Sequence, residues 1–205
     1  MITKKERMNS LSHGIGVLFG IVALIVLESR ADKSTNEGVA FLIYGLTQII
    51  LYTTSTATHL LTGKPKSHAV VRVLDQSAVY LLIAGTYTPI AMLALPNPYK
   101  WQLLTLIWTL AVAGIIMKSV FLAKEHLLSD LLYLPMGWMV VLFINPLRKY
   151  SPEGLLFWIF AGGITYSVGI IFYAVKKIQY HHLIWHLFVL GGSACFFIGF
   201  LLHLV

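Results

Sequence analysis

The sequence predicts an all-α, polytopic membrane protein with seven transmembrane helices in a single domain over residues 1–205. Of its 205 residues, 58% are hydrophobic and only 11% are charged, whereas soluble domains carry roughly 25% charged residues. The mean hydropathy is +0.79, which is more apolar character than one soluble core of this size can bury. The apolar runs are long and unbroken, a helical pattern rather than the alternation of a membrane β-barrel.

Seven runs of about 20 apolar residues, the length that crosses the hydrocarbon, follow one another along the chain. They predict spans at 10–28, 37–61, 68–95, 99–120, 126–143, 152–175 and 181–204. Turn and charge signals separate them, in order, at 30–36, 63–66, 96–98, 124–125, 145–152 and 176–177. Small residues, Gly16 with Gly20 and Gly191 with Gly192, predict close helix packing. Because the spans take up most of the chain, no separate extramembrane domain is expected.

The composition also excludes other classes of protein. The apolar fraction excludes disorder, and Cys195 is the one cysteine, so a disulfide scaffold is excluded. The net charge of +7 does not indicate a nucleic-acid partner, because basic residues of membrane proteins gather in cytoplasmic loops. No cleavable signal peptide is expected, since the first apolar run continues into a full span.

The basic residues predict the orientation, with the N-terminus in the cytoplasm and the C-terminus outside. Ten of the fifteen then lie inside: Lys4, Lys5, Arg7, Lys64, Lys66, Arg72, Lys118, Lys124, Lys176 and Lys177. The five that lie outside are Arg30, Lys33, Lys100, Arg148 and Lys149. We therefore expect a multi-pass protein of the plasma (inner) membrane.

Polar and ionisable groups inside spans are costly, so they are candidates for function. In the predicted orientation, most of them gather at one depth near the cytoplasmic side: His13, Ser55, His59, Asp75, His182 and His186. His203 falls at the outer face. The orientation is derived from Lys and Arg alone, so the gathering of these other polar residues at one depth is not built into it. That gathering predicts a single site.

The spacing of these residues favours a metal. His182 and His186 stand at i and i+4, which places two imidazoles on one helix face, and Ser55 and His59 repeat the spacing. Three imidazoles with an open fourth position are the arrangement of catalytic zinc. Asp75 would then bind or activate the water on the metal, or hold a ligating histidine through its second ring nitrogen. A further stripe opens the first span: Glu6, Asn9 and His13.

Structural roles stay open for several of these residues. An isolated H-x-x-x-H pair is a weak signal, because histidines often lie near the headgroups without a metal. Ser55 can bond to a carbonyl of its own helix. Asp75 can pair with Arg72, three residues earlier.

The motifs that these residues form are, in order, Glu6-x-x-Asn9-x-x-x-His13, Ser55-x-x-x-His59, Leu74-Asp75-Gln76-Ser77 leading to Ala84-Gly85-Thr86-Tyr87-Thr88-Pro89, and His182-Leu-Ile-Trp-His186. Over essentially the whole chain they resemble the hemolysin III family of bacterial membrane proteins. That family belongs to the progestin and adipoQ receptor family (PAQR), which includes the adiponectin receptors. The resemblance implies a cytoplasmic N-terminus, zinc bound by His59, His182 and His186 near the inner leaflet, and kinship with alkaline ceramidases, which cleave lipid amides.

Two positions depart from the bacterial pattern. Gln76 stands where a histidine often follows the aspartate, which puts a supporting contact or proton relay in question. Phe196 stands where a histidine is common deeper in the last span. Because Phe196 is ten residues beyond His186, about 15 Å along a helix, it is expected to lie away from the metal.

The function we expect is zinc-dependent hydrolysis of a membrane lipid amide, acting in membrane-lipid homeostasis. Zinc lowers the pKa of its water and polarises a carbonyl, Asp75 positions that water or acts as general base, and Ser55 orients the substrate or stabilises the oxyanion. Glu6, Asn9 and His13 are expected to support the ligands. The alternatives are a membrane sensor or receptor with structural zinc, a pore-forming cytolysin, and a transporter, which would need ionisable groups across the whole membrane depth.

Overall fold

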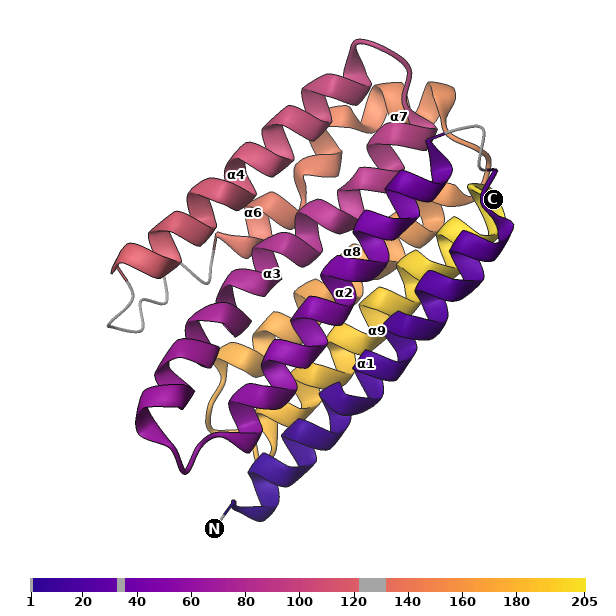
Figure 1. Ribbon diagram of the computed structural model, residues 1–205. Helices are drawn as coiled ribbons and strands as arrows, with labels where there is room; N and C mark the ends of the chain where they lie inside the picture. The colour runs from indigo at the N-terminus through magenta and orange to yellow at the C-terminus, as the bar shows by residue number, and fades with distance from the viewer. Residues whose placement is uncertain (1, 33–35, 122–131) are drawn as a thin grey trace.

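The computed structural model of the protein describes residues 2–32, 36–121 and 132–205. Within these ranges the chain is helical and contains no strand. Six of the described helices are long and apolar enough to cross a membrane: α1 (Lys4–Arg30), α2 (Glu37–Leu60), α3 (Pro65–Ala94), α4 (Tyr99–Phe121), α8 (Leu155–Ala174) and α9 (His181–His203). The predicted all-α membrane fold is thus confirmed for these six spans (Figure 1).

The fifth predicted span, 126–143, differs from the others. Residues 126–131 lie outside the described residues, as do Lys33 and Lys124. The remainder is not one continuous helix but two short ones, α6 (Tyr133–Gly137) and the 3-10 helix η1 (Met139–Phe143), and α7 (Ile144–Tyr150) follows directly after the predicted span. Pro135 and Pro146 fall in the first turns of α6 and α7, where a missing N–H is tolerated but a preceding helix has to end. The count of seven spans and the orientation stay predictions.

Tyr87 of α3 satisfies the backbone where this segment breaks. Its hydroxyl donates to the carbonyl of Gly137 over 2.6 Å and accepts from the N–H of Val140 over 2.8 Å. An unsatisfied backbone group in hydrocarbon costs several kcal/mol. These two bonds therefore allow the helical segment to be interrupted between α6 and η1 inside the bundle. Trp138 joins the break to α8, because its indole N–H donates to the Ser167 hydroxyl over 3.0 Å.

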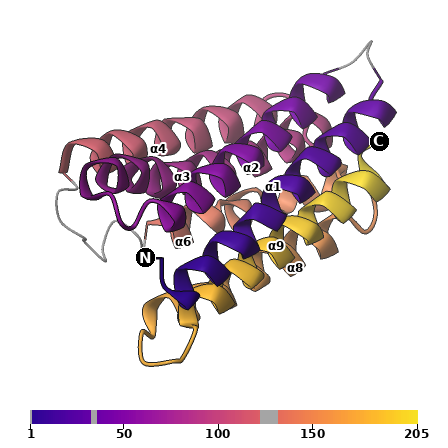
Figure 2. The ribbon, with the colours of Figure 1, turned by 60° about the horizontal axis from the view of Figure 1, so that its bottom comes forward.

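The long helices pack against one another mostly in chain order. α1 packs on α2, α2 on α3, α3 on α4 and α8 on α9, while α9 returns to pack on α1. The N- and C-termini lie at opposite ends of the bundle (Figure 1). Three segments lie at the end of the bundle that carries the N-terminus: the start of α1, the α2–α3 turn and the α8–α9 connection (Figures 1 and 2).

Glycines permit the closest of these helix contacts, as their positions predict. A Cβ atom at Gly16 of α1 would collide with the ring of Tyr52 on α2, and one at Gly192 of α9 would collide with the ring of Tyr166 on α8. Gly16 thereby lets α1 approach α2, and Gly192 lets α9 approach α8.

The outward-facing surface is apolar, as lipid contact requires. Large apolar side chains are exposed along the described helices, among them Leu11, Leu18, Leu142 and Phe157. A soluble protein rarely exposes such a continuous apolar surface. Lys118, in the last turn of α4, is buried, with its ammonium 5.9 Å from the centre of the Tyr133 ring, and its place on the cytoplasmic side stays a prediction.

Candidate metal centre

Three histidines meet between α2 and α9. His59 lies in the last turn of α2, and His182 and His186 lie in the first two turns of α9. One ligand atom of each lies within 4.8 Å of the other two, and among the described residues this is the one such group of three. His186 is 1% exposed and His59 7% exposed. The sequence prediction of these three side chains as neighbours therefore agrees with the structure.

A carboxylate of α1 orients His59. Nδ1 of His59 lies 2.6 Å from Oε2 of Glu6, so the Nδ1–H donates to the carboxylate. Nε2 of His59 is buried and has no hydrogen-bond partner among the described residues. A ring whose Nδ1–H is held by a carboxylate and whose Nε2 lone pair is unused is typical of a metal-ligating histidine.

The start of α1 also orients His186. Its Nδ1 lies 2.9 Å from the Ser12 hydroxyl and 3.2 Å from the carbonyl oxygen of Asn9. Ser12 donates its own proton to the Asn9 carbonyl over 2.7 Å, so its oxygen is left to accept. With two acceptors beside Nδ1, the proton of the neutral ring lies there and Nε2 carries the lone pair.

This donor set fits a metal ion. A buried polar atom without a partner is rare in a native protein and needs an explanation, and Nε2 of His59 is such an atom. Three neutral imidazoles provide the nitrogen ligands that zinc, copper, iron and nickel accept. The three histidines can therefore bind a metal ion.

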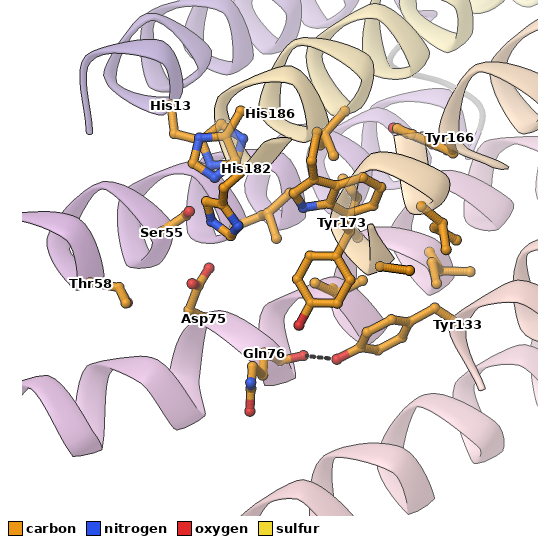
Figure 3. A pocket seen from close by; sticks show the side chains of 18 of the residues that line it. His13, Ser55, Thr58, Asp75, Gln76, Tyr133, Tyr166, Tyr173, His182 and His186 are labelled. Carbon is orange, nitrogen blue, oxygen red and sulfur yellow. Dashed lines mark hydrogen bonds between the residues drawn. The ribbon is translucent and has the colours of Figure 1, made fainter. Parts of the chain in front are cut away.

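Asp75 and Ser55 lie beside the histidines and in the same cavity (Figure 3). The side chain of Asp75 on α3 interacts with the hydroxyls of Ser55 and Thr58 on α2 and with the guanidinium of Arg72. Asp75 is not a member of the group whose ligand atoms all lie within 4.8 Å. The carboxylate shares the cavity with the three histidines without belonging to their cluster, and it also interacts with Arg72.

His13 packs flat against His186. The two ring centres are 3.5 Å apart and the planes differ by 14°, while the ring centre of Tyr52 lies 5.1 Å from that of His13, with the two planes at 75°. His13 is 3% exposed, and neither of its ring nitrogens has a partner within the described part of the chain. The predicted stripe of α1 therefore reaches the site in two ways, by the hydrogen bonds of Glu6 and Asn9 and by the stacking of His13.

The histidines form one side of a cavity of about 390 Å³. Its other walls come from α2, α3, α8, α9 and the α6–η1 break, and they are mostly apolar and aromatic (Figure 3). The lining residues that set this character include Leu51, Val79, Leu82, Ile83, Trp138 and Trp185. The histidine cluster thus borders a mostly apolar space.

The two unusual positions have separate places in the structure. Gln76 lies in the cavity wall, where its backbone carbonyl accepts from the Tyr133 hydroxyl over 2.8 Å (Figure 3). Phe196 is buried in the core, with its ring centre 5.8 Å from that of Tyr166. As expected from its distance along α9, Phe196 is not part of the cavity lining.

Several contributors were not predicted. Ser12 holds His186, and its place three residues after Asn9 puts it on the same helix stripe. Ser193 joins two tyrosines below the centre, since its hydroxyl lies 2.7 Å from the Tyr52 hydroxyl and 2.9 Å from that of Tyr166. The i+7 relation of Ser193 to His186 was the available signal for its place on the same face of α9.

Comparisons with known proteins agree with this fold and site. A family profile described as "Haemolysin-III related" matches residues 1–197. The chain is 44% identical over 204 residues to "Hemolysin-3" of Bacillus cereus, covering 98% of this chain and 93% of that protein. It is 43% identical over 204 residues to the "Hemolysin-3 homolog" of Bacillus subtilis (strain 168), covering 98% and 95%. The "Monocyte to macrophage differentiation factor" of Homo sapiens is 28% identical over 192 residues, covering 91% and 79%.

The fold and the site define a multi-pass α-helical membrane protein with a buried cluster of three histidines. With the profile match and the two Bacillus relatives, the chain belongs to the haemolysin III-related family. The resemblance expected from the ordered motifs is confirmed.

Proposed function

We propose that the protein is a zinc-dependent hydrolase of membrane amphiphiles, with an acyl amide of a lipid as the substrate class. One geometric relation carries the proposal: the histidine cluster opens onto a mostly apolar cavity of about 390 Å³. A metal that only joins helices needs no such space. A carbonyl attached to an acyl chain would reach the histidines through this cavity.

His59, His182 and His186 would hold the zinc, which when bound lowers the pKa of a water molecule and polarises a carbonyl group. The orientation of the ligands falls to α1. The Glu6 carboxylate and the Asn9 carbonyl keep the ring protons on the Nδ1 atoms of His59 and His186, so both Nε2 lone pairs stay available.

Proton transfer would fall to Asp75. Its carboxylate accepts the proton of the attacking water and returns it to the nitrogen of the leaving amine, which balances the hydrolysis of an amide. Ser55 donates its one hydroxyl proton to Asp75 and would hold that carboxylate in place. The apolar walls would bind the acyl chain and keep bulk water away.

The proposed place of reaction is the inner leaflet of the plasma membrane. The site lies at the N-terminal end of the bundle (Figure 1), and the ten-to-five excess of basic residues favours this end as the cytoplasmic one. The linkage region of a lipid lies at about this depth, so an amphiphile would enter sideways from the bilayer.

The test combines metal analysis with product detection. Protein purified in neutral detergent is assayed for zinc and then incubated with a mixed set of lipid amides and esters, and released fatty acid is measured by mass spectrometry. We expect the wild type to release fatty acid and His186→Ala to release none. His203→Ala should behave as the wild type, because His203 lies at the opposite end of the bundle. A zinc-loaded wild type that releases fatty acid from none of them would refute the proposal.

A sensor or receptor with structural zinc is the second candidate. The observation that favours it is that the three histidines join α2 to α9, so a bound metal would hold these helices together. For that function, loss of the metal would change the melting temperature and the arrangement of the helices, and the protein would hydrolyse no lipid with or without the metal.

A further inference from the structure

A second cavity, of about 360 Å³, lies at the end of the bundle that carries the N-terminus. We call it the vestibule and define it by Lys5 of α1, Arg72 of α3, and Lys176 and Tyr180 of the α8–α9 connection, which line it together with residues of the metal centre. Figure 2 brings this end forward and shows the start of α1 beside the α8–α9 connection. The Lys5 ammonium lies 5.8 Å from the centre of the Tyr180 ring, which agrees with that placement.

The vestibule and the apolar cavity meet at the metal centre. Both are lined by His59, His182, Glu6, Arg72 and Tyr173. The histidines therefore stand at the boundary between an apolar space on one side and a charged space on the other. A molecule that occupies both spaces would have the junction between its apolar and polar parts beside His59 and His182.

The charge of the vestibule selects the polar part. Three cationic side chains line it, namely Lys5, Arg72 and Lys176, and Glu6 is the one carboxylate among its described lining residues. The Glu6 carboxylate already accepts a hydrogen bond from His59, and Arg72 also interacts with the Asp75 carboxylate in the apolar cavity. The guanidinium fork of Arg matches the geometry of a phosphate group, and Lys supplies further charge.

Basic residues at this end are not by themselves a binding site, because membrane proteins commonly place them on the cytoplasmic side. The position of these three is what distinguishes them. Lys66 and Lys177 belong to the same end of the chain's fold and are exposed, yet neither lines either of the two cavities as described. They therefore provide a matched control for charge.

We infer that the vestibule binds the phosphate-bearing headgroup of an amphiphile whose acyl chain lies in the apolar cavity. The inference rests on the proposed function in one respect, that the same cavity receives the substrate, and it narrows the substrate class to anionic amphiphiles. The headgroup would be held by Lys5, Lys176 and Arg72, with the linkage to the acyl chain beside the histidines.

The test measures binding, so that it does not depend on turnover. Native mass spectrometry of the purified protein in neutral detergent compares a monoacylglycerol phosphate with the monoacylglycerol of the same chain length, which lacks only the phosphate. Inorganic phosphate is the third arm. We expect the phosphate-bearing amphiphile to bind at least about tenfold more tightly than the monoacylglycerol or inorganic phosphate. The monoacylglycerol has no charged group for the cationic side chains to bind, and inorganic phosphate has no acyl chain for the apolar cavity. Equal binding of the two amphiphiles, or binding of inorganic phosphate as tight as that of the amphiphile, would overturn the inference.

The double variant Lys5→Ala/Lys176→Ala should lose this preference by about tenfold, the combined effect of two exposed charge pairs. The control Lys66→Ala/Lys177→Ala removes the same charge from the same end and should keep it. A preference that both variants lose equally would show a general charge effect and would also overturn the inference. If lipid amides of either headgroup are hydrolysed at equal rates, this inference fails and the proposed function stands. If the binding pattern holds while no amphiphile is hydrolysed, the proposed function fails and the vestibule stands.

Discussion

Replacing Glu6 with Gln isolates what α1 contributes to metal binding. Oε2 of Glu6 lies 2.6 Å from Nδ1 of His59, the short distance of a charge-assisted hydrogen bond. Gln keeps the size and one acceptor oxygen but removes the charge. Loss of such a partner typically weakens metal binding by about 10- to 100-fold, or about 1.4–2.8 kcal/mol. Because 30% of the Glu6 side chain is exposed, solvent screens part of the effect, and we expect the lower end, about tenfold.

The assay is an equilibrium competition for zinc between the purified protein and a chelator of known affinity. Glu37→Gln is the matched control, since Oε2 of Glu37, the first residue of α2, also accepts a hydrogen bond, from the Asp32 N–H over 2.8 Å, at the opposite end of the bundle. Both variants should keep the melting temperature of the wild type. If Glu6→Gln and Glu37→Gln bind zinc equally well, Glu6 does not support the metal and this reasoning is wrong.

Three further predictions concern the acid–base group, pH and topology. Asp75→Asn should keep its zinc and melting temperature while hydrolysis falls on the order of 10²-fold; loss of zinc along with activity would instead make Asp75 a ligand. Bound zinc should be released on acidification, since only neutral imidazole binds a metal, and zinc content that is unchanged at acidic pH would contradict histidine ligation. A reporter fused after Val205 should lie outside the cytoplasm and one inserted near Lys64 should lie inside it; the same side for both would mean a miscounted span.

The parts of the fold that hydropathy controls could be predicted from the sequence. A run of about 20 apolar residues has few stable alternatives to a spanning helix in lipid, and the six long helices follow the predicted runs closely. The histidine cluster could also be predicted, because the i, i+4 spacing of His182 and His186 fixes their common face once α9 is a helix. The orientation of the spans then brings His59 to the same end.

Features that depend on tertiary contacts could not be predicted. The predicted span 126–143 reads as one apolar run, but the hydroxyl of Tyr87, some fifty residues away, satisfies the Gly137 and Val140 backbone groups and makes a break possible. Ser12 looked like an ordinary polar residue of α1, and its role appears only when His186 approaches across the bundle. Such pairings depend on how helices rotate about their axes, and hydropathy does not report that rotation.

The most direct test of the account is the metal content of the protein purified without added metal. We predict about one zinc per chain in the wild type and in His203→Ala. His186→Ala should lose most of it, because two imidazoles and water make a poor tetrahedral site. A wild type that binds no metal when zinc is supplied, or a His186→Ala variant that retains full zinc, would contradict the proposal that His59, His182 and His186 form a metal centre.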